Sequence, residues 1–296
     1  MLSSQNGLHD PLAAALVRKE REGTPSRNFG RLVSEGEGWR VLDVICTAGP
    51  DDRPFAERHA WESVSLVMSG TFSYRSDRGP SLISPGTLML GSVGRTFECS
   101  HQYGAGDRCF SFQFAPPLLE DIARDSNASR GHFIGDRLPP MRALAPLATR
   151  IATSEDRESF EEIAFELAGA VLRLESESRR TPEGFTRRDF AGIAEVVSHL
   201  EANLDQPQTL VNLARIARVS RFHFLRTFKT ATGITPHQWI LRTRLREAAK
   251  RIVLSRAPIT QIALDVGFED LSNFIRSFRA EFGLSPRAYR ASHATR

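Results

Sequence analysis

Two pairs of potential metal ligands lie in the first half of the sequence. Glu57 and His59 alternate in one segment, and Cys99 and His101 alternate in another. If these segments are strands, the two members of each pair point to the same face of a sheet. Cys109 follows after a short glycine-containing loop, and thiolate and imidazole donors together suit Zn²⁺ or another borderline-soft cation. These five residues are therefore a candidate metal site or thiol sensor.

The same residues also have a purely structural interpretation. Cys46, Cys99 and Cys109 could be small core residues, and His59 and His101 could be hydrogen-bonded or exposed. An odd number of cysteines gives no support to a disulfide framework. We therefore expect reduced thiols in a cytoplasmic protein.

A repeated pattern near the C-terminus carries the second candidate site. Two short segments share the i, i+3, i+4, i+7 spacing of a helix with one buried face: Leu210, Leu213, Ala214 and Ala217 in the first copy, and Ile259, Ile262, Ala263 and Val266 in the second. Each segment is followed by a turn and a candidate N-cap, Ser220 or Asp270. The offset between the copies grows from 49 to 50 residues across the turn, where Gly267 can adopt a positive φ. The pattern predicts a helix-turn-helix unit that occurs twice, with a duplicated helical bundle as the alternative.

The second helix of each predicted unit presents residues that suit contact with DNA. Phe224 and Phe228, like Phe274 and Phe278, have the spacing of a core-facing stripe. The outward positions are then candidate contacts to base edges in the major groove: Arg221, Phe222, Leu225 and Arg226 in the first unit, and Leu271, Ser272, Asn273 and Arg276 in the second. Arginine can pair bidentately with guanine, and asparagine with adenine. Five further arginines are expected to face phosphates or solvent: Arg242, Arg244, Arg246, Arg279 and Arg287.

The distribution of charge agrees with a nucleic-acid partner for one end of the chain. Residues 185–296 hold 18 lysine and arginine residues against 9 acidic ones, whereas residues 1–184 hold 21 against 26. A basic C-terminal third beside an acidic remainder indicates that the C-terminal part binds a polyanion. The sequence has no apolar window of membrane-spanning length, and charged residues follow the short apolar run of residues 12–17. We therefore expect neither a membrane span nor a secretory signal.

The elements that would position the N-terminal candidates are strands. Residues 63–69 and 109–114 alternate apolar with polar side chains, which is typical of half-buried strands. Turns that contain glycine and proline separate such segments between residues 40 and 114. The spacing predicts an antiparallel sandwich or barrel.

Helical spacing replaces this alternation after residue 116. Leu144, Leu147 and Ile151 fit one helix. A longer helix has a narrow apolar stripe: Phe160, Ile163, Ala164, Leu167, Val171 and Leu174. The stripe could form a coiled-coil-like seam with a second subunit, or it could dock on the predicted sheet. Polar residues 175–184 indicate an interdomain linker.

On these residues the C-terminal segment resembles the DNA-binding domain of the AraC/XylS family. The long signature of that family matches the segment from Ile259 to Arg290, and the first unit matches more loosely from Ser220 to Lys229. The resemblance implies that a long central helix joins the two units, here from near Pro236 to about residue 254. It also implies regulation of transcription, with RNA polymerase as a partner.

The strand-rich region resembles, less closely, the cupin-like sensor domains that precede this DNA-binding domain. The resemblance depends on His59, on the turn ending in Gly70 and on the segment Ser84–Leu90. A barrel of this type encloses a ligand pocket. The sequence lacks the His-x-His pair of cupin enzymes, and Phe97 stands about where a ligand histidine is expected. This departure argues against a catalytic iron or manganese centre.

Together these features predict an α+β chain, with an N-terminal cupin-like antiparallel barrel or sandwich and a C-terminal all-α domain. The expected boundaries are 1–116 for the sensor domain, 117–184 for a helical connector, candidate dimerisation region and linker, and 185–296 for the DNA-binding domain. We interpret the chain as a non-enzymatic, sequence-specific transcription regulator that binds double-stranded DNA and responds to an unknown small molecule or metal. Zinc is the candidate cofactor, and a homodimer is a further hypothesis. The alternative is a cupin-type metalloenzyme with a helical appendage.

Overall fold

The chain folds into two compact units. One comprises residues 1–138 and 156–181, and the other comprises residues 139–155 and 182–296. The structure is a computed structural model that describes residues 11–102, 104–154, 157–177 and 187–294. The first unit is built on strands and the second is helical, which confirms the expected α+β class.

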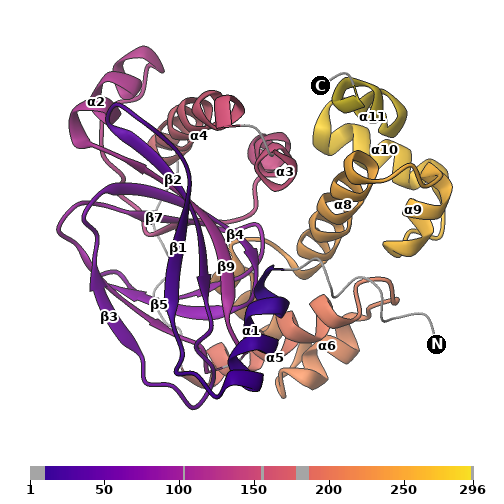
Figure 1. The fold of residues 1–296 in the computed structure, drawn as a ribbon. Helices are drawn as coiled ribbons and strands as arrows, with labels where there is room; N and C mark the ends of the chain where they lie inside the picture. The colour runs from indigo at the N-terminus through magenta and orange to yellow at the C-terminus, as the bar shows by residue number, and fades with distance from the viewer. Residues whose placement is uncertain (1–10, 103, 155–156, 178–186, 295–296) are drawn as a thin grey trace. The chain divides into compact units, whose positions relative to one another are not determined.

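Two antiparallel sheets form the core of the first unit (Figure 1). One has six strands, in this order across the sheet: β1 (Asn28–Gly36), β2 (Trp39–Cys46), β9 (Asp107–Phe114), β4 (Glu62–Ser69), β7 (Leu88–Gly91) and β10 (Arg137–Leu138). The other has four strands, again in spatial order: β3 (Phe55–Arg58), β8 (Thr96–Ser100), β5 (Phe72–Ser76) and β6 (Gly79–Ile83). The expected antiparallel arrangement is therefore present as two sheets.

Strand β9 shows how the alternation in the sequence is used. It pairs with β2 on one side and with β4 on the other, so it lies inside the six-stranded sheet. Phe110 faces helix α4 (Arg157–Glu177), and its ring centroid lies 5.9 Å from that of Phe160. Asp107 and Cys109 alternate with Phe110 and line a cavity on the opposite face. One face of this strand thus packs under a helix, and the other contributes to a candidate ligand site.

The apolar stripe of α4 is used inside the first unit. Helix α4 contacts β1 and helix α2 (Pro116–Asp125). Leu174 of the stripe is partly buried, and the other five residues are buried: Phe160, Ile163, Ala164, Leu167 and Val171. Of the two interpretations of this stripe, the structure supports docking on the sheet.

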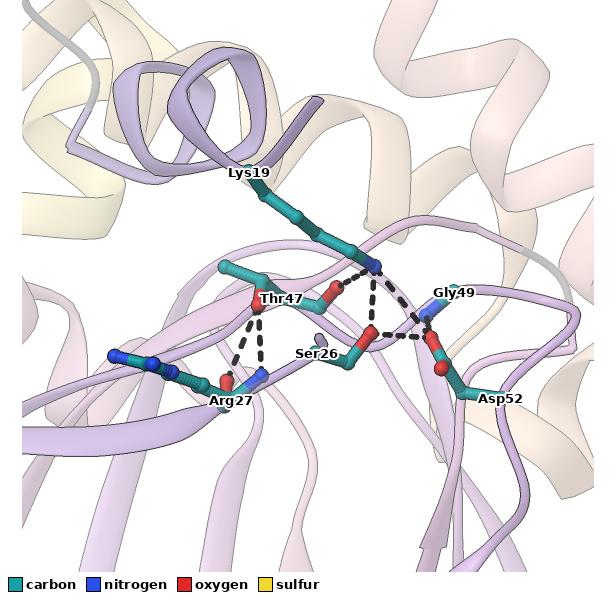
Figure 2. A network of polar contacts seen from close by, with 6 residues as sticks. All are labelled: Lys19, Ser26, Arg27, Thr47, Gly49 and Asp52. Atoms are coloured by element: carbon teal, nitrogen blue, oxygen red, sulfur yellow. Dashed lines mark hydrogen bonds and ion pairs between the residues drawn. The ribbon is translucent and has the colours of Figure 1, made fainter. Parts of the chain in front are cut away.

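A polar network fastens helix α1 (Pro11–Glu22) to the end of β2, as Figure 2 shows. Lys19 Nζ donates to the carbonyl oxygen of Thr47 at 2.9 Å and to Ser26 Oγ at 2.5 Å. Ser26 Oγ in turn donates to Asp52 Oδ2 at 2.5 Å, and the Lys19–Asp52 ion pair is 3.6 Å long. Because Thr47 directly follows β2, the network fixes the position where that strand ends.

Every secondary-structure element described in the second unit is a helix. Its elements are, in chain order, the short 3₁₀ helix η2 (Arg142–Leu144), α3 (Ala145–Thr153), α5 (Arg187–Ala202), α6 (Leu210–Ile216), α7 (Arg221–Thr232), α8 (Pro236–Leu254), α9 (Ile259–Asp265), α10 (Leu271–Phe282) and α11 (Pro286–Ala294). Helix α8 has the bounds expected for the central helix, and a capping box between Thr235 and Gln238 starts it. Among the described helices, none combines the length and hydrophobicity needed to cross a membrane.

The expected connector, residues 117–184, is divided between the two units. Helices α2 and α4 belong with the sheets, whereas residues 139–155 belong with the second unit. There Ala145 joins the apolar cluster formed by α8, α9 and α10, and Arg242 Nη1 donates to the carbonyl oxygen of Pro140. Helical periodicity in the sequence predicts that α3 exists, but it does not tell which core its apolar face enters.

Candidate nucleic-acid interface and sensor cavity

The turns of the two helix-turn-helix units are built alike. Each is closed by a backbone hydrogen bond to the first helix of its unit: Val219 to Ala214 at 3.1 Å, and Phe268 to Ala263 at 2.9 Å. The left-handed conformation in the turn is adopted by Arg218 (φ 57°) in the first unit and by Gly267 (φ 91°) in the second. A Cβ on Gly267 would lie 2.7 Å from Cζ of Arg244, so a larger residue there would displace the guanidinium and strain the backbone at this φ.

Side-chain caps start both recognition helices at the expected residues. Ser220 Oγ accepts a hydrogen bond from the His223 N–H at 3.3 Å. The Asp270 carboxylate accepts from the N–H groups of Ser272 and Asn273, at 3.0 and 2.9 Å. These bonds satisfy N–H groups that the first turn of a helix leaves unpaired, and they order the turn that carries candidate base contacts.

We expect Asp270→Ala to lower the free energy of unfolding of the second unit by about 1 kcal/mol, because two backbone N–H groups lose their acceptor. Urea denaturation followed by the helical circular-dichroism signal measures the change. Asp265→Ala is the matched control, since Asp265 is an exposed acid at the opposite end of a helix, where a carboxylate is not favoured. Equal effects of both substitutions would show that the cap does not stabilise the unit.

All eight residues predicted to contact bases are exposed. They are Arg221, Phe222, Leu225 and Arg226 on α7, and Leu271, Ser272, Asn273 and Arg276 on α10. Phe222 is 91% exposed, whereas Phe224 in the same turn is fully buried. The ring centroids of Phe224 and Phe228 are 5.5 Å apart, and those of Phe274 and Phe278 are 5.6 Å apart. The phenylalanine pairs therefore fix which side of each recognition helix faces outward.

The structure adds Ile275 to the exposed face of α10. An offset of 50 residues pairs Arg226 with Arg276 and Leu225 with Ile275, and the last two are each 39% exposed. Strict use of this offset in the sequence would have identified Ile275. Arg276 Nη2 donates to Asn273 Oδ1 at 3.3 Å, so these two polar candidates lie together on the face.

Two of the arginines expected at phosphates or solvent are instead used within the second unit. Arg242 forms an ion pair with Glu281 at 3.6 Å. Arg246 is half-buried, and desolvation lowers its pKa to about 10. The expectation was wrong for both because α8 is packed by helices on several sides, so few of its side chains face outward. Arg279 and Arg287 are exposed, as expected.

Arg244 was also expected to face phosphates or solvent, and this expectation was wrong. It connects the two helix-turn-helix units instead. From the central helix its Nε donates to the carbonyl oxygen of Leu204 at 2.8 Å, and Nη2 donates to that of Gln206 at 2.9 Å. Its Nη1 donates to the carbonyl oxygen of Gly267, in the turn of the second unit, at 2.7 Å. One planar guanidinium therefore joins the segment that precedes α6 to the turn that precedes α10.

A cavity of about 340 Å³ lies between the two sheets of the first unit. His59 and Glu57, two of the expected metal ligands, are at its wall. The His59 ring stacks on Phe97 with centroids 4.3 Å apart, its Nε2 is 3.2 Å from the Tyr74 hydroxyl, and burial lowers its pKa to about 4. Glu57 is exposed, and its Oε1 accepts from the Asn28 amide at 3.4 Å. Neither residue joins a group of three potential metal ligands among the residues described.

The cluster that does form consists of Cys46, His101 and Asp107, all buried. Their donor atoms lie within 4.8 Å of one another. His101 Nε2 is 2.6 Å from Asp107 Oδ1. Burial by itself lowers the pKa of His101, but the hydrogen bonds and charges of Asp107 and Cys46 outweigh it and raise that pKa to about 9. Of the five expected ligands, the structure thus places only His101 in this cluster, together with two residues outside the expected set.

Cys99 and Cys109, the two expected thiol ligands, lie beside this cluster. Both line the cavity, and both belong to an apolar group that includes Phe72 and Tyr74. Burial raises the pKa of both thiols, so they are protonated at neutral pH. The cavity between the sheets is therefore lined by three thiols, and an imidazole and a carboxylate lie close to one of them.

The second unit is a DNA-binding domain of the double helix-turn-helix class. Its two capped recognition helices expose equivalent faces, and a central helix joins the units. Residues 213–292 match the sequence model of a family described as a helix-turn-helix domain. This match includes both helix-turn-helix units of the domain.

Comparison with individual proteins defines the family. HTH-type transcriptional activator AarP of Providencia stuartii is 31% identical over 100 residues, which are 34% of this chain and 74% of AarP. Right origin-binding protein of Escherichia coli (strain K12) is 38% identical over 105 residues, which are 35% of this chain and 36% of that protein. The crystal structure of the DNA-binding domain of AdpA in complex with a target DNA is 32% identical, covers 35% of this chain and 94% of that domain, and has a TM-score of 0.34. The chain belongs to the AraC/XylS family. Its match spans little more than a third of the length of the Right origin-binding protein.

Proposed function

We propose that the protein is a sequence-specific, DNA-binding transcription regulator whose first unit senses an effector. The observation that carries this proposal is the equivalent exposure of Arg226 and Arg276 on two recognition helices whose opposite faces are fixed by buried phenylalanines. Each arginine can reach a base edge when its helix lies in the major groove. Two such modules on one compact domain read a longer site than either module alone.

The contacts divide into four kinds. Arg226, Arg276 and Asn273 supply hydrogen bonds to base edges. Phe222, with most of its ring in solvent, contacts a thymine methyl group or sugars, and it gains apolar burial there. The remaining exposed positions of both helices shape the fit to the groove: Arg221, Leu225, Leu271, Ser272 and Ile275. Exposed Arg279 and Arg287 neutralise phosphates.

Double-stranded DNA is the partner that this basic unit fits. The family resemblance implies RNA polymerase as a further partner. A homodimer that acts in the cytoplasm is a separate part of the proposal. A second copy does not use the apolar stripe of α4, because that stripe is buried within the first unit. The sensor role is supported by the cavity between the sheets, whose mixed apolar, thiol and charged lining suits a small molecule or a metal. The relatives named above are transcriptional or origin-binding proteins, which argues against the alternative of a cupin-type metalloenzyme.

We expect Arg276→Ala to weaken binding to the preferred DNA site by about 1–3 kcal/mol and to relax the preference at one base position. Gel-shift titration against a set of single-base variants of the site measures both effects. The matched control is Arg279→Ala, three residues further along the same helix and also exposed. The control should weaken all sequences alike and reduce the dependence of log K on log salt by about one charge.

The proposal would be contradicted by an unchanged sequence preference in both Arg276→Ala and Arg226→Ala. It would also be contradicted if the wild-type chain bound mixed-sequence DNA as tightly as any selected site. In either case the exposed faces of α7 and α10 would not be reading bases.

A further inference from the structure

Apolar side chains that face the cavity between the two sheets are incompletely covered. Five of them line the cavity from both sheets and are only half-buried: Leu42, Val44, Phe55, Met89 and Phe97. In a sandwich, the inner faces of the two sheets normally interdigitate and cover such side chains. The cavity therefore leaves apolar surface on both walls that a ligand can cover.

One end of the same cavity is rich in hydrogen-bond donors. Arg40 Nε donates to Gln113 Oε1 at 2.8 Å, and Gln113 Nε2 donates to Ser111 Oγ at 3.3 Å. Ser65 Oγ also donates to Ser111 Oγ, at 3.0 Å. All four residues line the cavity. Because Ser111 Oγ accepts two hydrogen bonds, its own hydroxyl proton is left to donate to a ligand.

The guanidinium of Arg40 is held in position with part of its fork still open. Its Cζ lies 4.7 Å from the centroid of the Trp61 ring, and its Nε is bonded to Gln113. Its two terminal nitrogens have no hydrogen-bond or ion-pair partner among the residues that the structure describes. Two adjacent N–H groups of a guanidinium match the two oxygens of a carboxylate.

The other charges in the cavity wall do not neutralise Arg40. Glu57 and Arg58 are adjacent, exposed and opposite in sign. Asp107 lies on β9 six residues from Gln113, the strand partner of Arg40, which is roughly 20 Å along the strand. An anion is therefore favoured at the donor-rich end of the cavity.

The size of the cavity and its apolar wall restrict the rest of the ligand. Val44 follows Arg40 by four residues on β2, so roughly 13 Å of strand separates them. The volume of about 340 Å³ is that of about eleven water molecules in the liquid, which suits a ligand of roughly a dozen non-hydrogen atoms. A sugar of this size would place hydroxyl groups against Leu42, Val44 and Phe97, where they would lose hydrogen bonds to water without replacement.

We propose that the cavity binds a small organic acid that has one carboxylate and a compact apolar body. Arg40 holds the carboxylate with its terminal N–H groups, and the Ser111 hydroxyl donates a further hydrogen bond to it. Leu42, Val44 and Phe97 cover the apolar body. This deepens the proposed function by naming the chemical class of the effector, and its regulatory meaning rests on that function.

Isothermal titration calorimetry of the full chain with hydrocinnamate, phenylacetate and hydrocinnamamide tests the proposal. Hydrocinnamate should bind one to one. Its amide has the same apolar body and should bind at least about tenfold more weakly, because it cannot form the charge-assisted hydrogen bonds. Arg40→Met should lower the affinity for hydrocinnamate about 10- to 100-fold and remove the preference for the acid over the amide. Phe97→Ala should weaken both ligands by a similar factor, because Phe97 contacts the apolar body.

Arg31→Met is the matched control for Arg40→Met. Arg31 lies on β1 of the same sheet, pairs with Asp43 at 3.2 Å and is not among the residues that line the cavity. Its substitution removes the same charge from the first unit. The affinity of this variant for hydrocinnamate should equal that of the wild type.

Equal affinity of the wild type for hydrocinnamate and its amide would overturn the proposal, as would wild-type affinity in Arg40→Met. No saturable binding of either acid, or tighter binding of xylose or glucose than of both acids, would overturn it as well. If Arg40→Met unfolds, the comparison of acid with amide in the wild-type chain still decides the matter. DNA binding is measured separately without ligand: a chain that binds DNA selectively but no acid contradicts this inference alone, whereas a chain that binds the acid but no DNA contradicts the proposed function.

Discussion

Phe224→Ala is expected to lower the free energy of unfolding of the DNA-binding unit by about 3–5 kcal/mol, whereas Phe222→Ala should change it by no more than about 0.5 kcal/mol. The two residues lie in the same turn of α7. Phe224 is fully buried against Phe228, so its removal leaves a cavity, but Phe222 is 91% exposed. Urea denaturation followed by the helical circular-dichroism signal measures both variants.

The same pair separates stability from DNA recognition. At a temperature where both variants are folded, Phe222→Ala should bind the preferred site about tenfold or more weakly, because an apolar contact worth about 1–3 kcal/mol is lost. Phe224→Ala should keep the wild-type preference among sites as long as it is folded. If Phe222→Ala destabilised the unit as much as Phe224→Ala, the orientation of α7 described here would be wrong.

Arg244→Met should lower the free energy of unfolding of the second unit by about 2–4 kcal/mol, since three charge-assisted hydrogen bonds to carbonyl oxygens are lost. It should also weaken the dependence of binding on half-site spacing. In the wild type, insertion of half a helical turn between the half-sites should reduce affinity about 100-fold, because the two units cannot then engage together. The variant should lose much less, and gel-shift titration of the two DNA sequences measures the ratio.

Lys250→Met is the control for Arg244→Met. Lys250 lies on the same central helix but is exposed, so its substitution should leave both the unfolding free energy and the spacing ratio close to the wild type. An unchanged spacing ratio in Arg244→Met would mean that packing along α8 fixes the two units without the guanidinium. In that case Arg244 would contribute to stability alone.

The C-terminal unit could be predicted closely from the sequence because its signals are local. The N-caps Ser220 and Asp270, the glycine in the second turn and the bounds of α8 all depend on residues a few positions apart. The positions of Arg242 and Arg244 could not be predicted in this way. Whether an arginine on α8 faces solvent depends on helices that approach from elsewhere in the chain, and helical periodicity does not report them.

The candidate ligands of the first unit show that strand alternation does not predict which residues meet across a sheet. Alternation alone predicts the pairs Glu57 with His59 and Cys99 with His101, because residues i and i+2 of a strand share a face. The actual neighbours Cys46 and Asp107 are 61 residues apart and meet only through the register of β2 with β9. That register is set by the packing of the whole sandwich, so the sequence supplied the residue types but not their partners.

The second unit is expected to read DNA through two helix-turn-helix units that lie about one turn of duplex apart. Hydroxyl-radical footprinting of the full chain on its selected site tests this directly. We expect two protected segments on one face of the duplex with centres roughly 10–10.5 bp apart, one weakened selectively by Arg226→Ala and the other by Arg276→Ala. A single protected segment, or two substitutions that weaken the same segment, would contradict the account.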